Sequence, residues 1–362
     1  MNLYLINSNL PSQKKNITSS TSFKQYFLPQ LIMASTTPTI PKTVTKEIIT
    51  EMGTFISIFS DGSIERPIQS PFVPPVLNDP KTGHSSKDIV IPHNPAVSSR
   101  IYLPKITSPS SKFPILVYFH GGAFLFESAF SQLYHEHLKT LASQANIIIV
   151  SVEYRLAPEF PVTACYHDCW AALKWVSSHS NNTLNNPEPW LIEHGDFARV
   201  FIGGDSAGGN ITHKIAIQAG TESLPCDIKI LGAIMIHLYF HSSYPIGSEP
   251  IIEPQDNLFH QVWHLCYPNS PHGIDNPLVN PLGEGATSLE KLGCSRILIC
   301  VAEKDKLRDR GVWYWKNVKK SGWNGKLELF EEKDENHVYH LLKPESESAR
   351  KFIQRLVSFV QE

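Results

Sequence analysis

The spacing of apolar and polar positions changes character along this chain of 362 residues. Residues 46–52 show helical spacing, and 55–103 then alternate as antiparallel strands with Asp61-Gly62 as a hairpin turn. From Pro114 on, short apolar runs alternate with helical segments, which predicts a mostly parallel sheet with crossovers. The expected strands are 55–59, 63–66, 87–91, 98–103, 115–119, 147–152, 200–202, 230–236, 296–301 and 326–330. The expected later helices are 131–143, 163–178, 207–219, 311–321 and 345–360.

The alternation stops after Ile236, and aromatic, histidine and proline residues crowd into the stretch that follows. We therefore expect one domain over 46–362, with a cap formed by about 46–54 and 238–290. Residues 1–45 are rich in Ser, Thr, Asn and Pro and contain no acidic residue. They predict a disordered extension, with a transit peptide or a start at Met33 as the alternatives.

A serine lies between a short apolar strand and a helix, in the sequence Gly204-Asp-Ser206-Ala-Gly208. This G-x-S-x-G spacing is typical of a nucleophile elbow, in which a strained turn projects the serine hydroxyl and the flanking glycines avoid a clash. The N-terminus of the following helix favours a developing negative charge. A glycine-rich structural turn is the alternative, and a phosphate loop is disfavoured because no Lys-Ser/Thr follows. Ser206 is the candidate nucleophile.

The expected strand 115–119 runs directly into His120-Gly121-Gly122-Ala123-Phe124. A glycine pair here lets backbone N–H groups turn toward the serine, where a hydrolase stabilises an oxyanion. The candidate donors are the amides of Gly121, Gly122, Ala123 and Ala207. A tight strand-to-helix turn is the structural alternative.

A nucleophilic serine needs a histidine base and an acid that orients it, each in a loop after a strand. The acids after 296–301 are Glu303, Asp305 and Asp309, and the histidines after 326–330 are His337 and His340. Asp305 and His337 are best placed by position, with Glu303 as the competing acid.

Composition narrows the classes of partner. The net charge is −2 and no basic patch stands out, so no nucleic-acid partner is expected. No apolar run approaches a membrane span, and the six cysteines lack the spacing of metal ligands. We expect no cofactor and no metal, reduced cysteines and a cytoplasmic location, or a plastid one if residues 1–45 are a transit peptide.

Several motifs together resemble the plant carboxylesterases of the hormone-sensitive-lipase type, from about Lys46 to the C-terminus. They are His120-Gly-Gly-Ala-Phe, Glu153-Tyr-Arg-Leu-Ala-Pro-Glu159, Gly204-Asp-Ser-Ala-Gly-Gly-Asn210, Val301-Ala-Glu-Lys-Asp305 and His337-Val-Tyr-His340. The branch that looks most similar is that of the 2-hydroxyisoflavanone dehydratase-like proteins. The resemblance implies an α/β-hydrolase fold and a Ser206–Asp305–His337 triad. Ala123 departs from the usual third glycine of the oxyanion motif, which stiffens that loop.

Three functions are therefore compared. The first is a serine carboxylesterase that hydrolyses esters of small, largely apolar molecules. The second is a dehydratase acting on a flavonoid-like substrate, although enzymes of that branch often carry threonine where this chain has Ser206. The third is a hormone receptor, because the gibberellin receptors resemble this family but have lost the histidine that is present here as His337.

Overall fold

The computed structural model describes residues 46–181 and 187–362. The extension predicted for residues 1–45 lies outside the described residues. The chain divides into two compact units after Pro67, and each is described by itself.

The described part of the first unit is a three-stranded antiparallel sheet of β1 (Ile48–Met52), β2 (Ile56–Phe59) and β3 (Ile64–Glu65). The expected hairpin is present, and the amide of Ser63 donates to the Asp61 carboxylate at its turn (2.9 Å). The helix expected at 46–52 is wrong, because β1 pairs with β2. The consecutive β-branched residues of Ile48-Ile49-Thr50 favour an extended backbone over a helix.

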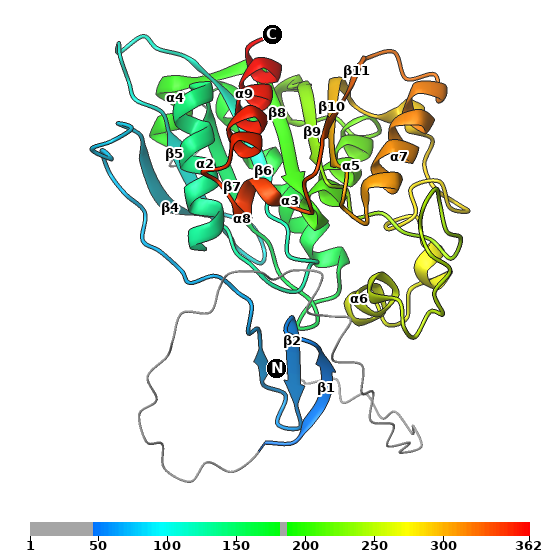
Figure 1. Cartoon of the computed structure of the whole chain (residues 1–362). Coiled ribbons are helices and arrows are strands. Elements are labelled where there is room, and N and C mark those ends of the chain that lie inside the picture. Colours follow the sequence, from blue (N-terminus) through cyan, green and yellow to red (C-terminus); the bar gives the residue numbers. More distant parts are fainter. Residues whose placement is uncertain (1–45, 182–186) are drawn as a thin grey trace. The chain divides into compact units, whose positions relative to one another are not determined.

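The second unit is built on one eight-stranded sheet, with the strand order β11-β10-β9-β8-β6-β7-β5-β4 (Figure 1). β5 pairs antiparallel with both β4 and β7, and all the other neighbours are parallel. The predicted sheet, antiparallel at its start and parallel afterwards, is therefore confirmed. Its strands are β4 (Ser85–Ile91), β5 (Val97–Leu103), β6 (Phe113–Phe119), β7 (Ile148–Glu153), β8 (Gly195–Asp205), β9 (Ile230–Ile236), β10 (Cys294–Ala302) and β11 (Lys326–Glu332).

Helices cover both faces of this sheet. α2, α8 and α9 pack together on one face, over a core that includes Cys300 and Ala302 of β10 (Figure 1). Val301 points the other way and contacts Gly311 of α7, and α3 packs against α5. The helices are α2 (Gln132–Ala145), α3 (Thr163–Ser178), α4 (Pro189–His194), α5 (Ala207–Ala219), α6 (Leu258–Cys266), α7 (Arg308–Lys320), α8 (Tyr339–Leu342) and α9 (Glu347–Gln361), and short 3₁₀ turns are η1 (His179–Asn181), η2 (Pro225–Asp227), η3 (Gly273–Asp275) and η4 (Leu289–Lys291).

The stretch between β9 and β10 interrupts the alternation as expected, and α6 is the α-helix within it. Residues of this stretch contact the loop after β6. The Cys266 thiol donates to the carbonyl of Ala123 (3.4 Å), and the rings of Phe124 and Tyr239 meet edge to face with centroids 5.7 Å apart. The part of the predicted cap at 238–290 therefore lies beside the candidate oxyanion loop.

The parallel strands bring the candidate chemical groups to one edge of the sheet. His120, Ser206, Asp305 and His337 follow β6, β8, β10 and β11 respectively, each within five residues of the strand's end. Because parallel strands all end at the same edge, residues far apart in sequence meet there.

Candidate active site

Ser206 sits on a sharp turn between β8 and α5, with φ +54° and ψ −114°. A Cβ on Gly208 would lie 1.9 Å from the carbonyl oxygen of Phe119, and one on Gly204 would lie 2.3 Å from the same oxygen. Both positions therefore exclude any larger residue, because each presses on the end of β6. The strained serine is 8% exposed, with its hydroxyl held at the carboxyl edge of the sheet.

His337 connects the serine with a carboxylate. Its Nε2 lies 3.0 Å from Ser206 Oγ, and its Nδ1 lies 2.7 Å from Asp305 Oδ2. The other oxygen of Asp305 accepts the amide of Leu307 (2.9 Å), which fixes the carboxylate in its loop. A neutral imidazole whose Nδ1–H is held by a carboxylate presents a basic Nε2 to the hydroxyl. The three candidates thus form a continuous hydrogen-bonded chain.

The neighbouring candidates lie elsewhere. Glu303 accepts the amide of Asp334 at the surface, and Asp309 accepts from Ser248 and Arg308. His340 is buried with its ring centroid 4.6 Å from that of Phe352, so it packs in the core.

Burial and the charge of the partner shift the pKa values of Asp305 and His337 in opposite directions. Burial alone would lower the pKa of His337, but the charge and hydrogen bond of Asp305, with the charge of Asp205, outweigh it, so the pKa lies above the usual value. Burial alone would raise the pKa of Asp305, but the charge and hydrogen bond of His337 dominate and lower it. The carboxylate therefore stays ionised while the imidazole is poised to take a proton.

The loop after β6 has an unusual backbone. Gly122 has φ +100°, and a Cβ there would lie 2.0 Å from the carbonyl oxygen of Phe126. Ala123 and Phe124 also have positive φ, at +55° and +62°. The His120 ring stacks on that of Tyr154 at 4.2 Å between centroids, while the Tyr154 hydroxyl donates to the His120 carbonyl (2.7 Å). These contacts hold a conformation that the chain alone disfavours.

One expected oxyanion donor is engaged elsewhere. The amide of Gly121 donates to the Tyr134 hydroxyl (2.6 Å), so it is not available to an oxyanion, in contrast to the expectation. A Cβ on Gly121 would lie 2.4 Å from Asp205 Oδ2, which explains the glycine by packing. The amides of Gly122, Ala123 and Ala207 stay as predicted donors.

Sequence reasoning missed the polar network beneath this loop. Asp205, next to the serine, accepts hydrogen bonds from Tyr118 (2.8 Å) and Tyr134 (2.9 Å). Burial raises the pKa of Asp205 to about 6, against the two tyrosine hydrogen bonds. A carboxylate inside the elbow motif was the available signal, but its partners lie 71 and 87 residues away in sequence. The network ties the oxyanion loop to the elbow.

The base and two of its neighbours each have a possible metal-ligand atom, and these atoms lie within 4.8 Å of one another. The three residues are His237, Asp305 and His337. They are of the types that bind transition metals. Asp305 and His337 are bonded to each other, however, and His237 Nδ1 accepts the amide of Val338 (2.9 Å). The Nδ1 atoms of both histidines and the Asp305 carboxylate are therefore already engaged in hydrogen bonds, which suits the cluster to acid–base chemistry.

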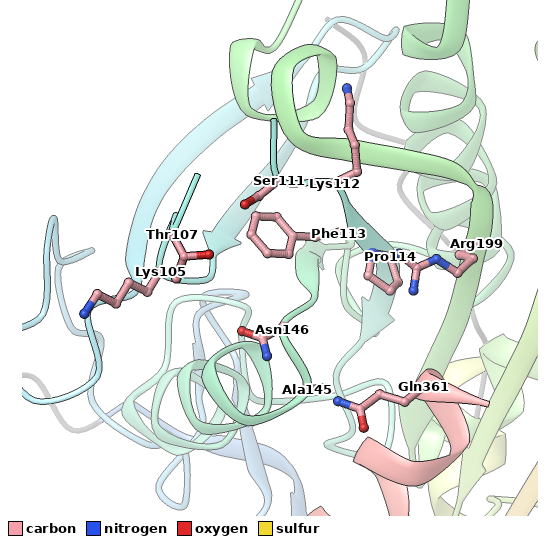
Figure 2. A pocket seen from close by; sticks show the side chains of 10 residues that line it. All are labelled: Lys105, Thr107, Ser111, Lys112, Phe113, Pro114, Ala145, Asn146, Arg199 and Gln361. Atoms are coloured by element: carbon pink, nitrogen blue, oxygen red, sulfur yellow. The ribbon is translucent and has the colours of Figure 1, made fainter. Parts of the chain in front are cut away.

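A pocket of about 400 Å³ lies at the opposite, amino edge of the sheet (Figure 2). It is lined by Lys105, Thr107, Ser111, Lys112, Phe113, Pro114, Ala145, Asn146, Arg199 and Gln361. Phe113 begins β6 and Asn146 caps the C-terminus of α2, so the pocket is separated from Ser206 by the length of the strands. It is not the site of the serine chemistry.

Among the described helices, none has the length and apolar character needed to cross a membrane.

Comparison with known proteins agrees with this architecture. A family model described as "alpha/beta hydrolase fold" matches residues 116–341. A "2-hydroxyisoflavanone dehydratase" from Glycyrrhiza echinata is 50% identical over 330 residues, covering 91% of this chain and all of the relative. "Probable carboxylesterase 7" from Arabidopsis thaliana is 43% identical over 305 residues, covering 84% of this chain and 95% of the relative.

Solved structures are similar as well. A hyperthermophilic esterase from the archaeon Pyrobaculum calidifontis aligns with a TM-score of 0.60 at 25% identity, over 76% of this chain and 84% of that one. The chain is therefore an enzyme of the esterase-type α/β-hydrolase family, within its hormone-sensitive-lipase-like group of plant carboxylesterases and 2-hydroxyisoflavanone dehydratases.

Proposed function

We propose that this enzyme is a serine carboxylesterase, with Ser206 as nucleophile, His337 as base and Asp305 as the acid that orients the base. The observation that carries the proposal is the chain of contacts from Ser206 Oγ to His337 Nε2 (3.0 Å) and from His337 Nδ1 to Asp305 (2.7 Å). This is the geometry that proton transfer from a hydroxyl requires.

Catalysis follows in two halves. His337 Nε2 takes the proton of Ser206 as Oγ attacks the ester carbonyl, and the amides of Gly122, Ala123 and Ala207 stabilise the oxyanion. His337 then returns the proton to the leaving alcohol, which departs and leaves an acyl-serine. Water, deprotonated by His337, attacks the acyl carbon, and His337 returns that proton to Ser206 Oγ as the acid is released. Each oxyanion donor contributes about 3–4 kcal/mol to transition-state stabilisation.

The surroundings of the oxyanion loop support a small, largely apolar substrate. Phe124 packs between Tyr166 and Tyr239, with ring centroids at 6.4 and 5.7 Å. Tyr239 in turn meets Phe259 of α6 at 5.8 Å. An aromatic cluster beside the oxyanion loop favours substrates that are apolar or aromatic next to the reacting ester.

A dehydratase reaction on a flavonoid-like ketone is the second candidate. It is favoured by the 50% and 49% identity to two proteins named 2-hydroxyisoflavanone dehydratase, from Glycyrrhiza echinata and Glycine max. In that reaction His337 would take a proton from the carbon beside the carbonyl, and the hydroxyl on the next carbon would leave to complete a molecule of water. Ser206 favours the esterase, because a serine can form the acyl-enzyme and enzymes of the dehydratase branch often carry threonine there.

A fluorophosphonate probe and p-nitrophenyl esters test the esterase. The native enzyme should label on serine and hydrolyse short esters, and Ser206→Ala should do neither. Ser99→Ala, another buried serine in β5, serves as the matched control and should keep both activities. Persistent labelling of the Ser206→Ala variant would overturn the proposal.

A 2-hydroxyisoflavanone separates the two candidates. The esterase proposal expects slow or no dehydration by the native enzyme, and loss of ester hydrolysis in Ser206→Thr. Faster dehydration than ester hydrolysis, kept in Ser206→Thr, would favour the lyase instead.

A further inference from the structure

A second buried histidine, His237, lies against the candidate base. It is not part of the relay, the hydrogen-bonded chain of Ser206, His337 and Asp305. His237 follows β9, is 1% exposed, and its ring centroid lies 5.5 Å from that of His337. Its own amide donates to the carbonyl of Cys300 in β10 (2.8 Å). Its backbone is thus anchored to the sheet two residues before the end of β10.

The side chain of His237 reaches the loop that carries the base. Its Nδ1 accepts the amide of Val338, the residue directly after His337, at 2.9 Å. This hydrogen bond therefore sets the plane of the His337–Val338 peptide. Because that peptide begins at the Cα of His337, its orientation determines where the imidazole points.

The Val338 backbone needs such an anchor. Val338 has φ +46° and ψ +33°, the left-handed region that β-branched residues strongly disfavour. A residue persists in this region when its surroundings hold it there. The strained residue itself donates the hydrogen bond, from the Val338 amide to His237. The two residues are 101 positions apart in sequence.

The surroundings of the two histidines shift their pKa values in opposite directions. An imidazole whose Nδ1 accepts a hydrogen bond is neutral, with its proton on Nε2. Burial lowers the pKa of His237 to about 3, although Asp305 acts in the opposite direction. The rings of His337, Tyr339 and His340 surround it. His237 therefore stays neutral over the range in which His337 titrates, and its bond to Val338 persists as the base gains and loses a proton.

We propose that His237 is a positioning residue for the base: by accepting the Val338 amide it holds the strained turn in which His337 reaches both Ser206 and Asp305. This inference rests on the proposed role of His337 in the serine relay. In this proposal His237 acts through the Val338 amide and not as an acid or a base.

Two substitutions of His237, whose side-chain amides differ in length by one carbon, test the inference. His237 has φ +47°, which asparagine tolerates. His237→Asn places an oxygen where Nδ1 stands, so the Val338 amide keeps its acceptor. His237→Gln carries the same amide one carbon further out and loses that acceptor. On p-nitrophenyl esters we expect the Asn variant to keep kcat within about threefold of the native enzyme, and the Gln variant to lose about 10–100-fold in kcat with KM changed less than about threefold.

Val338→Gly separates positioning from a general loss of structure. Glycine adopts positive φ without strain, so adding it to His237→Gln should recover about tenfold of the lost kcat. Thermal melts report whether each variant folds. Equal losses in the Asn and Gln variants, native kcat in the Gln variant, or a folded Asn variant without activity would each overturn the inference.

Ser206→Ala is measured in parallel to separate the two proposals. If that variant still hydrolyses esters, the esterase proposal fails whatever His237 does. If Ser206→Ala is inactive and His237→Gln is as fast as the native enzyme, the positioning role alone fails.

Discussion

Positive φ occurs at both edges of the sheet, but at more residues along the carboxyl edge. At the carboxyl edge, positive φ occurs at residues that disfavour it, among them Ala123, Ser206 and Val338. At the amino edge, where the pocket of Figure 2 lies, Asn146 closes α2 with a positive φ that asparagine tolerates well. Cys226 and Asp227, just before β9, also have positive φ, at +59° and +54°.

Polar groups differ between the edges in the same way. At the carboxyl edge Asp205 and Asp305 are buried, and their oxygens accept hydrogen bonds from tyrosine, histidine or a backbone amide. At the amino edge Arg199 pairs with Asp196 in a bridge whose side chains are 40% and 26% exposed. Strain and desolvation are thus concentrated where the candidate chemistry lies, held by contacts from distant strands. The exposed pair of Arg199 and Asp196 at the amino edge can be changed with little consequence.

Breaking the relay should have the largest effect. Asp305→Asn keeps the shape of the side chain but removes the charge that holds His337, and we expect kcat to fall about 10⁴-fold. The pKa of His337 is raised by this carboxylate, so the acid limb of the native pH profile should lie above the ordinary histidine value of about 6.5. In the variant that limb should move to lower pH, since the neutral base persists further into acid.

The amino edge offers the matched control. Asp196→Asn makes the same chemical change in the exposed pair with Arg199 and should leave kcat within about twofold. A pH profile of ester hydrolysis for both variants checks the prediction. An Asp305→Asn enzyme with native kcat would contradict the assignment of this residue.

The network under the oxyanion loop should give an intermediate effect. Tyr134→Phe removes the acceptor of the Gly121 amide and one donor to Asp205, so the loop loses its tie to the elbow. We expect kcat to fall about 10–100-fold, with about 1–3 kcal/mol of stability lost. Steady-state kinetics and denaturant unfolding measure the two effects.

Tyr118→Phe is the control for this change. It removes the other donor to Asp205 without touching Gly121, so stability should fall by a similar amount while kcat changes less than about threefold. Equal losses of kcat in both variants would mean that Asp205, and not the loop amide, matters for turnover.

The spacing of apolar residues predicted the strands of the large sheet and the residues that follow them. Apolar runs located the strands from β4 to β11, and the post-strand positions of Asp305 and His337 singled them out before any geometry was known. The short α4 was missed because its cap is Glu188, which accepts the Trp190 amide in place of the usual Ser, Thr, Asp or Asn.

The supporting contacts could not be predicted in the same way. The partners of Asp205 and Val338 come from 71 to 101 residues away, and no spacing in the chain records which tyrosine or histidine the fold brings to them. The Gly121 amide illustrates the limit. A glycine in the right motif suggested a donor to substrate, while the fold directs that amide to Tyr134.

The smallest effect is expected at the amino edge. Arg199→Ala removes the exposed bridge to Asp196, which is worth about 0–1 kcal/mol, and lies the length of the sheet away from Ser206. The melting temperature should therefore fall by no more than about 2–4 °C. Ester hydrolysis should keep its kcat, KM and acid limb, because no hydrogen bond of the relay or of the Asp205 network involves this residue. Thermal melts and a pH profile measure both quantities. A severalfold change in kcat would show that the two edges are coupled through the strands, and the contrast between them would then have to be replaced by a mechanism that spans the sheet.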